Sequence, residues 1–496
     1  MKLVLVICKL ANFILKKMGK GSTFPGSLAY KLNKKILNYF KIPELVIAVT
    51  GSAGKGSTTK IIAQILEKNN KKVVYNKSGG NLLPGILSVL IDNSDLNGNI
   101  KADALVMEVD ERYTKAVFKV INPKYVVVTN ISRDQPPRNI HVDVILDKIK
   151  EALDPSMKLI LNGDDPILRN LDLEEAFEKI YFGIEKNELS YTENKFNSLN
   201  INYCPKCNSR LKYNFYHIEA VGDYYCTKCD FKRPNIDFKA TKIDLDNNYM
   251  IINENKVAIA FNILYYAYNI LAAYSVCSMI GIEEKDICKY ISDMENNSKL
   301  NNSYKYKDKN VYVLSNKNEN NMTFNQSVLF ASNKKTEKTI VIGWKEISRR
   351  YKYNDMSWLY DIEFELLNDS LTQKIVCIGR DKFDIGLRMK YAGFENEKIK
   401  IYETLQEAEQ EIKSSNGDII AILNFDYVVP FNKMMMEEIV WKNNYNFPNW
   451  CVTWERNEIF NGNKYIILIL WFNEFIWRKW KYKSYYAIFK RSGYRC

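Results

Sequence analysis

The chain has 496 residues, which is too many for a single hydrophobic core, so two or three domains are expected. Its hydrophobic content of 46% is ample for packed interiors. The formal net charge of +13 favours a polyanionic partner, which nucleic acid, a phosphorylated metabolite or the anionic inner face of a membrane would each provide.

The first 21 residues imitate a signal peptide, MKLVLVICKLANFILKKMGKG. Their apolar run ends at Lys9 after six residues, and no small-residue cleavage site follows. We therefore predict an amphipathic helix within a helical segment over residues 1–40. The most apolar stretch elsewhere, residues 465–477, is interrupted by Asn473 and Glu474 and is too short to span a bilayer. A cytoplasmic protein is the default expectation.

A glycine-rich loop follows the strand that we expect over residues 45–50 and precedes helical periodicity over residues 57–67. A strand, a glycine turn and a helix amino terminus together form an anion cradle, because backbone N–H groups and the helix dipole converge on phosphate. Lys55 can reach terminal phosphates, and Ser57 or Thr58 offers a hydroxyl to Mg²⁺. The residues expected to bind the nucleotide here are Gly51, Gly54, Lys55, Gly56, Ser57 and Thr58.

Polar side chains also follow three further expected strands. In residues 102–113, Glu108 directly follows the apolar run, and a carboxylate at the carboxyl end of a parallel strand can hold Mg²⁺. The alternative is a solvated run of charges, and Asp110 and Glu111 fall on the following loop. The next two strands bring further polar residues to the same edge: Thr129, Asn130, Asp134, Asn162, Asp164 and Asp165. This pattern predicts an open parallel α/β sheet with its site along one edge.

Four cysteines form two tight pairs, Cys204-x-x-Cys207 and Cys226-x-x-Cys229, which are separated by eighteen residues. This is the spacing of a Cys₄ zinc ribbon, and an insert of this size (about residues 200–233) needs the metal to hold together. Four thiolates fill the coordination shell, so the zinc is expected to be structural. His217 is interpreted as a surface strand residue and not as a ligand. The six other cysteines read as buried free thiols: Cys8, Cys277, Cys288, Cys377, Cys451 and Cys496.

The second half of the chain predicts another α/β unit. Helix-forming sequence over residues 261–298 closes an ATP-binding domain of residues 41–305, and an Asn-rich stretch follows it. Strand patterns then alternate with helical ones, which predicts a Rossmann-like domain over residues 306–436. Residues 437–496 lack such patterns although six of the eight tryptophans lie there. They are either a tail translated from a shifted reading frame and not natively folded, or an aromatic, basic tail for membrane contact.

Six segments occur in the order seen in the central domain of Mur ligases: TGSAGKGSTT, EVDE, VVTNISRDQ, LNGDDP, YFGI and YNILAA. Four further features narrow the resemblance to one family: the Cys₄ insert, STFPGSLAYKL near the amino terminus, and the downstream segments NDMSWLYDIEFE and CIGRDKFDIGLRMKYAGF. Over roughly residues 10–430, the chain resembles the MurT family, the ligase-like subunits of lipid II isoglutaminyl synthase. Residues Pro136 and Pro137 depart from the family pattern, in which a Leu-Asp pair follows Asp-Gln.

The resemblance implies a reaction. MurT-type proteins use ATP and Mg²⁺ to activate the α-carboxylate of D-glutamate in the lipid II stem peptide as an acyl phosphate, which ammonia converts to D-isoglutamine. A GatD-like glutamine amidotransferase, bound as the other half of a heterodimer, would supply the ammonia. The enzyme would act at the inner face of the cell membrane, and no nucleic-acid partner is expected. This chain has no recognisable glutaminase nucleophile, which agrees with a separate ammonia source.

The resemblance also implies roles for individual residues. Lys55 would act in catalysis by contacting the phosphates, and Glu108 would act by binding Mg²⁺. Ser57 would also bind Mg²⁺, and Asn269 would lie near the adenine. Asp355 would complete a triad with the Cys–His pair of the partner, and Asp361 competes for this role. The alternatives are a Mur or folylpolyglutamate-type amino acid ligase, and a nucleic-acid-binding ATPase that reads DNA or RNA with its zinc ribbon.

Overall fold

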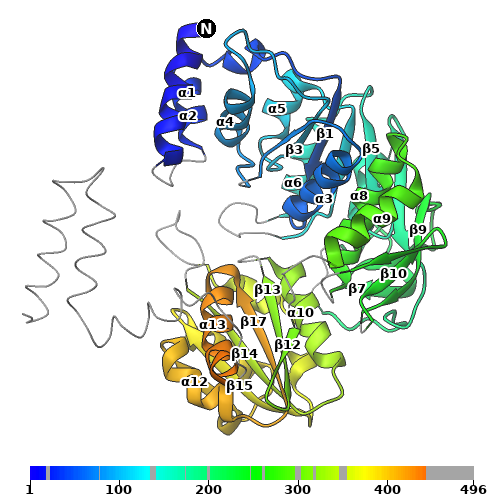
Figure 1. Cartoon of the computed structure of the whole chain (residues 1–496). Helices are drawn as coiled ribbons and strands as arrows, with labels where there is room; N and C mark the ends of the chain where they lie inside the picture. The colour runs from blue at the N-terminus through cyan, green and yellow to red at the C-terminus, as the bar shows by residue number, and fades with distance from the viewer. Residues whose placement is uncertain are drawn as a thin grey trace, which may run out of the picture. The chain divides into compact units, whose positions relative to one another are not determined.

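A computed structural model of the chain describes the following residues: 1–17, 23–77, 79–133, 141–173, 175–197, 201–245, 247–259, 263–296, 303–316, 320–345 and 355–442. The chain divides into two units, residues 1–434 and 435–496. The first unit holds two large sheets (Figure 1). Among the described residues, no helix has both the length and the apolar content needed to cross a bilayer.

The first sheet has nine strands in the order β11-β10-β9-β6-β5-β4-β1-β3-β2. The strands are β1 (Leu45–Thr50), β2 (Val73–Tyr75), β3 (Ala104–Glu108), β4 (Tyr125–Val128), β5 (Lys158–Asn162), β6 (Glu178–Ile184), β9 (Phe238–Asp244), β10 (Tyr249–Ile252) and β11 (Asn255–Ala258). Strands β2 to β6 and β9 run parallel with β1, whereas β10 and β11 extend the sheet in antiparallel fashion. This antiparallel extension was not among the sequence-based predictions.

Helices cover both faces of this sheet, which explains why its central strands are apolar throughout. In β1, Ile47 and Val49 join the core on one face, and Val46 and Ala48 join the core on the other. The first face is covered by α3 (Lys55–Lys68), α8 (Leu264–Met279) and α9 (Glu284–Asn296). The second is covered by α4 (Leu83–Asn93), α5 (Thr114–Ile121) and α6 (Val142–Lys150), with the short α7 (Pro166–Arg169) and η2 (Asn170–Asp172) behind them.

The amino-terminal segment packs against the helices that cover the second face of this sheet. It comprises α1 (Lys2–Lys17), α2 (Phe24–Leu32) and the 3₁₀ turn η1 (Ile36–Tyr39). Helix α2 approaches α4 so closely that a Cβ at Gly26 would lie 1.9 Å from the carbonyl oxygen of Pro84. Glycine is therefore required at this crossing. The helix predicted at the amino terminus is present.

The cysteine insert forms a separate antiparallel hairpin of β7 (Leu211–Ile218) and β8 (Val221–Cys226). Tyr224, Phe231 and Leu211 form a small core together with Cys204 and Cys226. Because this core has so few members, it cannot stabilise the hairpin alone.

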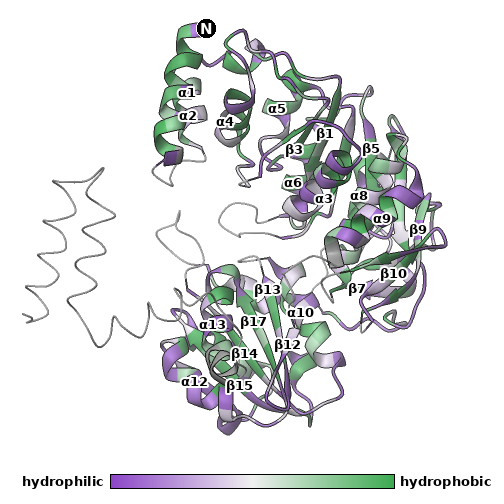
Figure 2. Cartoon of the chain, in the orientation of Figure 1, coloured by the Kyte–Doolittle hydropathy of each residue, from purple (hydrophilic) through white to green (hydrophobic). Residues whose placement is uncertain are grey.

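The second sheet has six strands in the order β12-β13-β17-β14-β15-β16. Its strands are β12 (Ser303–Tyr306), β13 (Lys309–Asn316), β14 (Lys338–Trp344), β15 (Thr372–Gly379), β16 (Ile399–Tyr402) and β17 (Asp418–Asn424). Its helices and 3₁₀ turns are α10 (Asn321–Asn333), η3 (Ser357–Asp361), η4 (Phe364–Leu367), α11 (Lys382–Tyr391), η5 (Asn396–Lys398), α12 (Leu405–Ser414) and α13 (Phe425–Lys442). All strands are parallel except β12 at the edge. Figure 2 shows hydrophobic residues concentrated in these strands. The predicted α/β fold class, with a parallel P-loop sheet, a Cys₄ insert and a following Rossmann-like sheet, is confirmed.

Candidate active site

The glycine-rich loop between β1 and α3 adopts a conformation that only glycine allows at two positions. Gly51 has φ of 122° and Gly54 has φ of 81°. A Cβ at Gly51 would lie 2.5 Å from Oγ1 of Thr129, and one at Gly54 would lie 2.2 Å from Oδ1 of Asn269. The loop is thus shaped both by its backbone and by the side chains pressed against it.

Residues after β4 hold this loop from the side. Thr129 Oγ1 donates to the carbonyl of Ala53 at 2.6 Å, and Asn130 Nδ2 donates to the same carbonyl at 2.9 Å. In return the Ala53 N–H donates to Asn130 Oδ1 at 3.0 Å. Thr129 and Asn130 therefore lie at the predicted edge of the sheet, and these contacts shape the phosphate loop.

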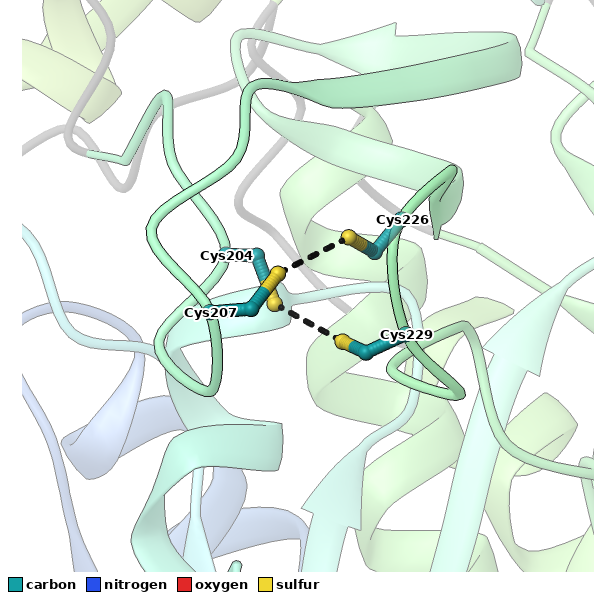
Figure 3. A group of neighbouring side chains, drawn as sticks. All are labelled: Cys204, Cys207, Cys226 and Cys229. Carbon is teal, nitrogen blue, oxygen red and sulfur yellow. Dashed lines mark hydrogen bonds between the residues drawn. The ribbon is translucent and has the colours of Figure 1, made fainter.

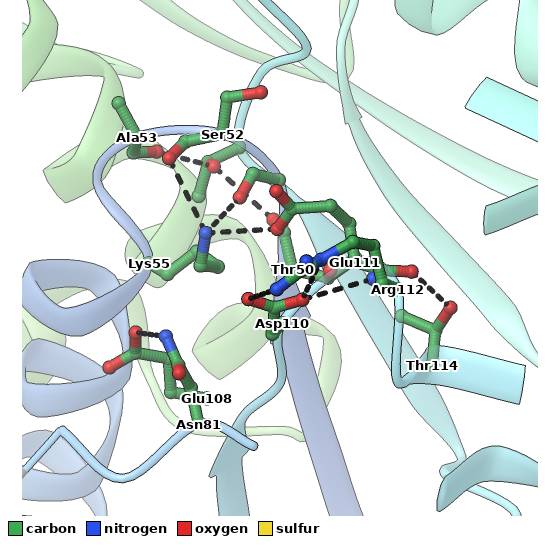
Figure 4. A network of polar contacts seen from close by, with 12 residues as sticks. Thr50, Ser52, Ala53, Lys55, Asn81, Glu108, Asp110, Glu111, Arg112 and Thr114 are labelled. Atoms are coloured by element: carbon green, nitrogen blue, oxygen red, sulfur yellow. Dashed lines mark hydrogen bonds and ion pairs between the residues drawn. The ribbon is translucent and has the colours of Figure 1, made fainter. Parts of the chain in front are cut away.

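Lys55, the first residue of α3, is buried and held by three acceptors. Its Nζ contacts the carbonyl oxygens of Gly51 and Ser52, the second at 3.3 Å, and Oε2 of Glu111 at 3.2 Å (Figure 4). Glu111 is only 2% exposed, so this is a buried ion pair. The sequence places Glu111 on the loop after β3, which is confirmed, but gives no sign that it faces Lys55 across 56 residues.

Glu108 ends β3 with its carboxylate at the amino terminus of α3. A Cβ at Gly56 would lie 3.2 Å from Oε2 of Glu108, so the missing side chain at Gly56 leaves room for that oxygen. Oε1 accepts from Asn81 Nδ2 at 2.8 Å (Figure 4). Asn76 pairs with both backbone groups of Glu108 at 2.9 Å. Asn76 and Asn81 are not predicted. They follow β2, which has three residues.

The hydroxyl groups after Lys55 differ in their surroundings. Thr58 is buried, and its Oγ1 has no hydrogen-bond partner among the described residues, whereas Ser57 is exposed. A buried hydroxyl without a partner is uncommon and calls for an explanation. Together with Lys55 and the carboxylate of Glu108, these oxygen donors fit a Mg²⁺-bound nucleotide phosphate, because Mg²⁺ prefers hard oxygen ligands.

Asn269 in α8 touches this loop at Gly54 and is buried. The structure thus brings together Gly51, Gly54, Lys55, Gly56, Thr58, Glu108 and Asn269 from four separate elements. The role of Asn269 beside an adenine stays a prediction.

Asp164 and Asp165, which follow β5, serve the fold. Asp164 is fully buried and accepts hydrogen bonds from the Ile184 N–H, Tyr268 Oη and Arg233 Nε, each at 2.7 Å. Asp165 accepts from the Ile167 N–H at the start of α7, and burial raises its pKa to about 7. Asp164 therefore ties β5, β6 and α8 to the carboxyl end of the cysteine insert.

The four cysteines meet at one point (Figure 3). Their sulfur atoms all lie within 4.8 Å of one another, with Cys204 to Cys229 at 3.5 Å and Cys207 to Cys226 at 3.4 Å. A tetrahedral zinc site with Zn–S bonds of about 2.3 Å has sulfurs roughly 3.8 Å apart, so this group fits zinc. The Lys228 N–H donates to Cys226 Sγ at 3.3 Å, which would further stabilise a thiolate there.

The interpretation of His217 as a surface residue is wrong. The side chain is fully buried, with Nε2 2.9 Å from the Ile184 carbonyl and Nδ1 3.2 Å from Ser190 Oγ. Burial lowers its pKa, so the imidazole is neutral. The error arises because β7 does not lie on the surface: it packs His217 edge-on against Tyr268 of α8. The four scattered cysteines in the described part of the chain are buried and free as predicted: Cys8, Cys277, Cys288 and Cys377.

The two candidate aspartates near η3 have different partners. Asp361 pairs with Arg133 Nη1, and Arg133 Nη2 donates to Ser357 Oγ at 3.1 Å. Asp355 is partly exposed and accepts from the Ser357 N–H at 2.9 Å. The hydrogen bonds from Ser357, with a smaller contribution from the charge of Arg133, lower the pKa of Asp355.

Several predictions fall on residues outside the described part of the chain: the site-edge position of Asp134, the altered loop at Pro136 and Pro137, the buried free thiols Cys451 and Cys496, and the nature of the tail of residues 437–496 beyond its first six residues, which continue α13.

Comparisons with known proteins agree with this geometry. Residues 49–225 match the family described as Mur ligase middle domain, and residues 318–427 match MurT ligase C-terminal. The chain is 28% identical over 439 residues to the lipid II isoglutaminyl synthase (glutamine-hydrolyzing) subunit MurT of Staphylococcus aureus, covering 87% of this chain and 96% of that protein. It is 32% identical over 232 residues to the subunit of the same name from Streptococcus pneumoniae, covering 46% of this chain and 50% of that one.

Solved structures show the same fold. A pseudomurein peptide ligase type C from Methanothermus fervidus superposes with a TM-score of 0.60 at 21% identity, covering 82% of this chain and 81% of that one. MurF from Acinetobacter baumannii superposes with a TM-score of 0.56 at 14% identity, covering 83% and 80%. This chain therefore has the fold of the Mur ligases and combines a match to a Mur ligase middle domain with a match to a MurT-type C-terminal domain.

Proposed function

We propose that this chain is the ATP-dependent ligase subunit that amidates the α-carboxylate of D-glutamate in the lipid II stem peptide. The observation that carries the proposal is the buried ammonium of Lys55 at the end of the glycine loop, 3.2 Å from the carboxylate of Glu111. The next residue of the same helix, Gly56, adjoins the carboxylate of Glu108. The names of the staphylococcal and pneumococcal relatives support the choice of substrate.

A carboxylate does not react with ammonia at neutral pH, so its oxygen must first become a leaving group. In the proposed reaction a carboxylate oxygen attacks the γ-phosphorus of ATP, the bond to ADP breaks, and an acyl phosphate forms. Ammonia then attacks the acyl carbon, phosphate leaves, and a proton is lost to give the amide. Lys55 would stabilise charge on the phosphoryl oxygens. Glu108 and Ser57 would hold Mg²⁺, which supplies further charge neutralisation when bound.

The ammonia would come from a glutaminase partner. Among the described residues, the cysteines outside the zinc cluster are buried, and burial raises their pKa values, to about 11 for Cys288 and about 12 for Cys377. Such thiols are poor nucleophiles. The chain has two histidines, and His217 is buried and neutral. We therefore assign glutamine hydrolysis to a GatD-like amidotransferase subunit.

An exposed aromatic surface supports a protein partner at the second sheet. Tyr360, Phe383, Leu387 and Tyr391 are 55%, 66%, 49% and 69% exposed, and the rings of Tyr360 and Tyr391 lie 6.2 Å apart. We call this group the α11 face. Exposed aromatic clusters are typical of protein interfaces. Tyr360 belongs to η3, which begins two residues after Asp355, so a partner on the α11 face would lie near that carboxylate.

The proposal is tested with the full chain, the amidotransferase, lipid II, Mg-ATP and glutamine, by mass spectrometry of the lipid product. Amidation replaces a hydroxyl group by an amino group, and Lys55→Ala should abolish this change while the complex still assembles. Persistent amidation by Lys55→Ala would refute the role of the phosphate loop. Incorporation of an amino acid in place of ammonia would instead support the amino acid ligase alternative. Salt-sensitive oligonucleotide binding would support the nucleic-acid-binding ATPase.

Asp355 and Asp361 provide a matched pair of variants for the ammonia step. Asp355 has a lowered pKa and is partly exposed, so it could accept a hydrogen bond from a partner histidine, whereas Asp361 is engaged by Arg133. Asp355→Asn should reduce glutamine-dependent amidation by roughly two or more orders of magnitude and spare amidation with free ammonium. Asp361→Asn should retain glutamine-dependent amidation. An equal loss with glutamine and with ammonium in Asp355→Asn would assign this residue to the ligase step.

A further inference from the structure

Helix α1 is apolar on two opposite faces, of which the protein covers one. Leu5 and Cys8 are fully buried in the core shared with α2 and α4. Two polar contacts fix the same side of the helix: Lys9 Nζ donates to the carbonyls of Ile91 and Ser94, and Asn12 Nδ2 donates to Asp92 Oδ1 at 2.9 Å. These contacts set the rotation of α1 about its axis, so its opposite face points away from α4.

Over residues 3–14 that opposite face carries large apolar side chains, and the exposed Lys17 follows them on the same face at the end of the helix. Leu3, Val6, Ile7, Leu10, Phe13 and Ile14 are 72%, 44%, 42%, 58%, 57% and 49% exposed. At 100° per residue these six positions fall within an arc of roughly 120°, so they form one continuous stripe along the helix. We call this set the α1 stripe. In Figure 2, α1 is coloured as hydrophobic along most of its length. The exposed face of a helix on a soluble domain is normally polar, so the α1 stripe requires a partner.

The charged side chains of the amino-terminal segment itself have one sign. Residues 1–43 contain nine lysines and no aspartate or glutamate. Lys2 and Lys17 at the two ends of α1 are exposed, and Lys17 Nζ lies 4.6 Å from the ring centroid of Phe13. Lys31, Lys34 and Lys35 are exposed on and just after α2, where Phe24 and Leu32 are also 53% and 52% exposed.

We infer that the α1 stripe docks this enzyme on an anionic lipid surface. An aliphatic stripe bordered by lysines is the pattern of a helix that lies in the plane of a membrane interface, with its apolar side among the acyl chains and its cations at the headgroups. A protein partner is less well matched, because the centres of such interfaces favour Tyr, Trp and Arg, and the α1 stripe contains none of these. No part of the inference depends on which reaction the enzyme catalyses.

The experiment is flotation of the purified full chain with vesicles of phosphatidylcholine, with and without phosphatidylglycerol, in the absence of ATP and lipid II. The wild-type chain should float with the anionic vesicles, and high salt should weaken the binding. Leu10→Glu/Phe13→Glu should reduce binding about tenfold or more, because two carboxylates would enter the apolar layer and repel the headgroups. Leu10→Ser/Phe13→Ser separates loss of apolar contact from added charge and should also reduce binding.

The matched control is Phe383→Glu/Leu387→Glu on the α11 face. It places the same two charges on another exposed helix and should float as the wild type does. Binding of the amidotransferase provides a second measurement on the same variants. The Phe383→Glu/Leu387→Glu control should weaken that complex, whereas the α1 variants should not. ATP binding by every variant shows that the fold is intact.

Three outcomes overturn the inference: a wild-type chain that does not float, α1 variants that float as well as the wild type, or an equal loss in the control. Self-association that disappears in the α1 variants, without vesicle binding, would assign the stripe to a second copy of the chain instead. Since flotation needs neither substrate nor turnover, its failure is separate from a failure of the amidation assay.

Discussion

Variants of Lys55 and Glu111 can separate the effect of this ion pair on the stability of the fold from the effect of the Lys55 ammonium on catalysis. The two side chains are 7% and 2% exposed, and Nζ lies 3.2 Å from Oε2. Lys55→Met keeps most of the aliphatic stem but removes the ammonium that faces a buried carboxylate. Removing one partner of a buried pair costs about 3–5 kcal/mol in the free energy of unfolding. For a domain of this size the loss lowers the Tm of its transition by on the order of 10 °C.

The compensating variant is Lys55→Met/Glu111→Gln, which removes the buried negative charge as well. We expect it to recover a large part of the lost stability, because replacing both partners of a buried pair costs less than removing one. It should not recover turnover, since the phosphoryl oxygens still lack their cation. Differential scanning calorimetry measures the first effect, and ATP-dependent amidation measures the second. The reasoning fails if Lys55→Met melts with the wild type, or if the double variant is no more stable than the single one.

Three further predictions concern the surrounding scaffold. Gly54→Ala should weaken ATP binding at least tenfold, as measured by calorimetric titration, because φ of 81° is strained for alanine and the new Cβ meets Asn269 at 2.2 Å. Removal of the cluster metal with a chelator should lower the Tm and expose the β7–β8 hairpin to proteolysis, and added Zn²⁺ should reverse both effects. The third prediction concerns Asp165, whose pKa rises from 3.8 to about 7 on folding. Between these two pH values the folded state holds a proton on Asp165 that the unfolded state has lost. The free energy of unfolding therefore falls as the pH rises from about 4 to about 7. Asp165→Asn, which preserves the helix cap, should flatten that part of the stability profile measured by urea unfolding.

The parts of the site that could be predicted are those encoded within one strand and the turn that follows it. Lys55 and Glu108 were found because a buried strand, a turn and a polar side chain are adjacent in sequence, and parallel topology then brings such turns together. Asn76 and Asn81 escaped detection because β2 has only three residues, which is too short for a recognisable strand pattern.

The side-chain directions at those positions could not be predicted, because they depend on contacts between distant segments. Asp164 follows β5 at the expected edge, but its carboxylate is occupied by Ile184, Tyr268 and Arg233. His217 was placed on the surface, but the packing of β7 against α8 buries it. In each case the partner lies at least 20 residues away in sequence, so local periodicity carries no information on it.

The cysteine insert connects these observations, because the turn of its hairpin contacts helix α10. Asn325 of α10 donates through Nδ2 to Glu219 at that turn at 2.7 Å, and its Oδ1 accepts from the Glu363 N–H at 2.8 Å. Asn325 Nδ2 also donates to the carbonyl of Asp361 at 3.1 Å. The metal would thus fix a hairpin whose far end supports the segment that carries Asp361 and lies beside Asp355. If the proposed ammonia step is correct, a cysteine cluster that performs no chemistry would still influence it, because the hairpin that the cluster braces contacts the backbone of Asp361 through Asn325.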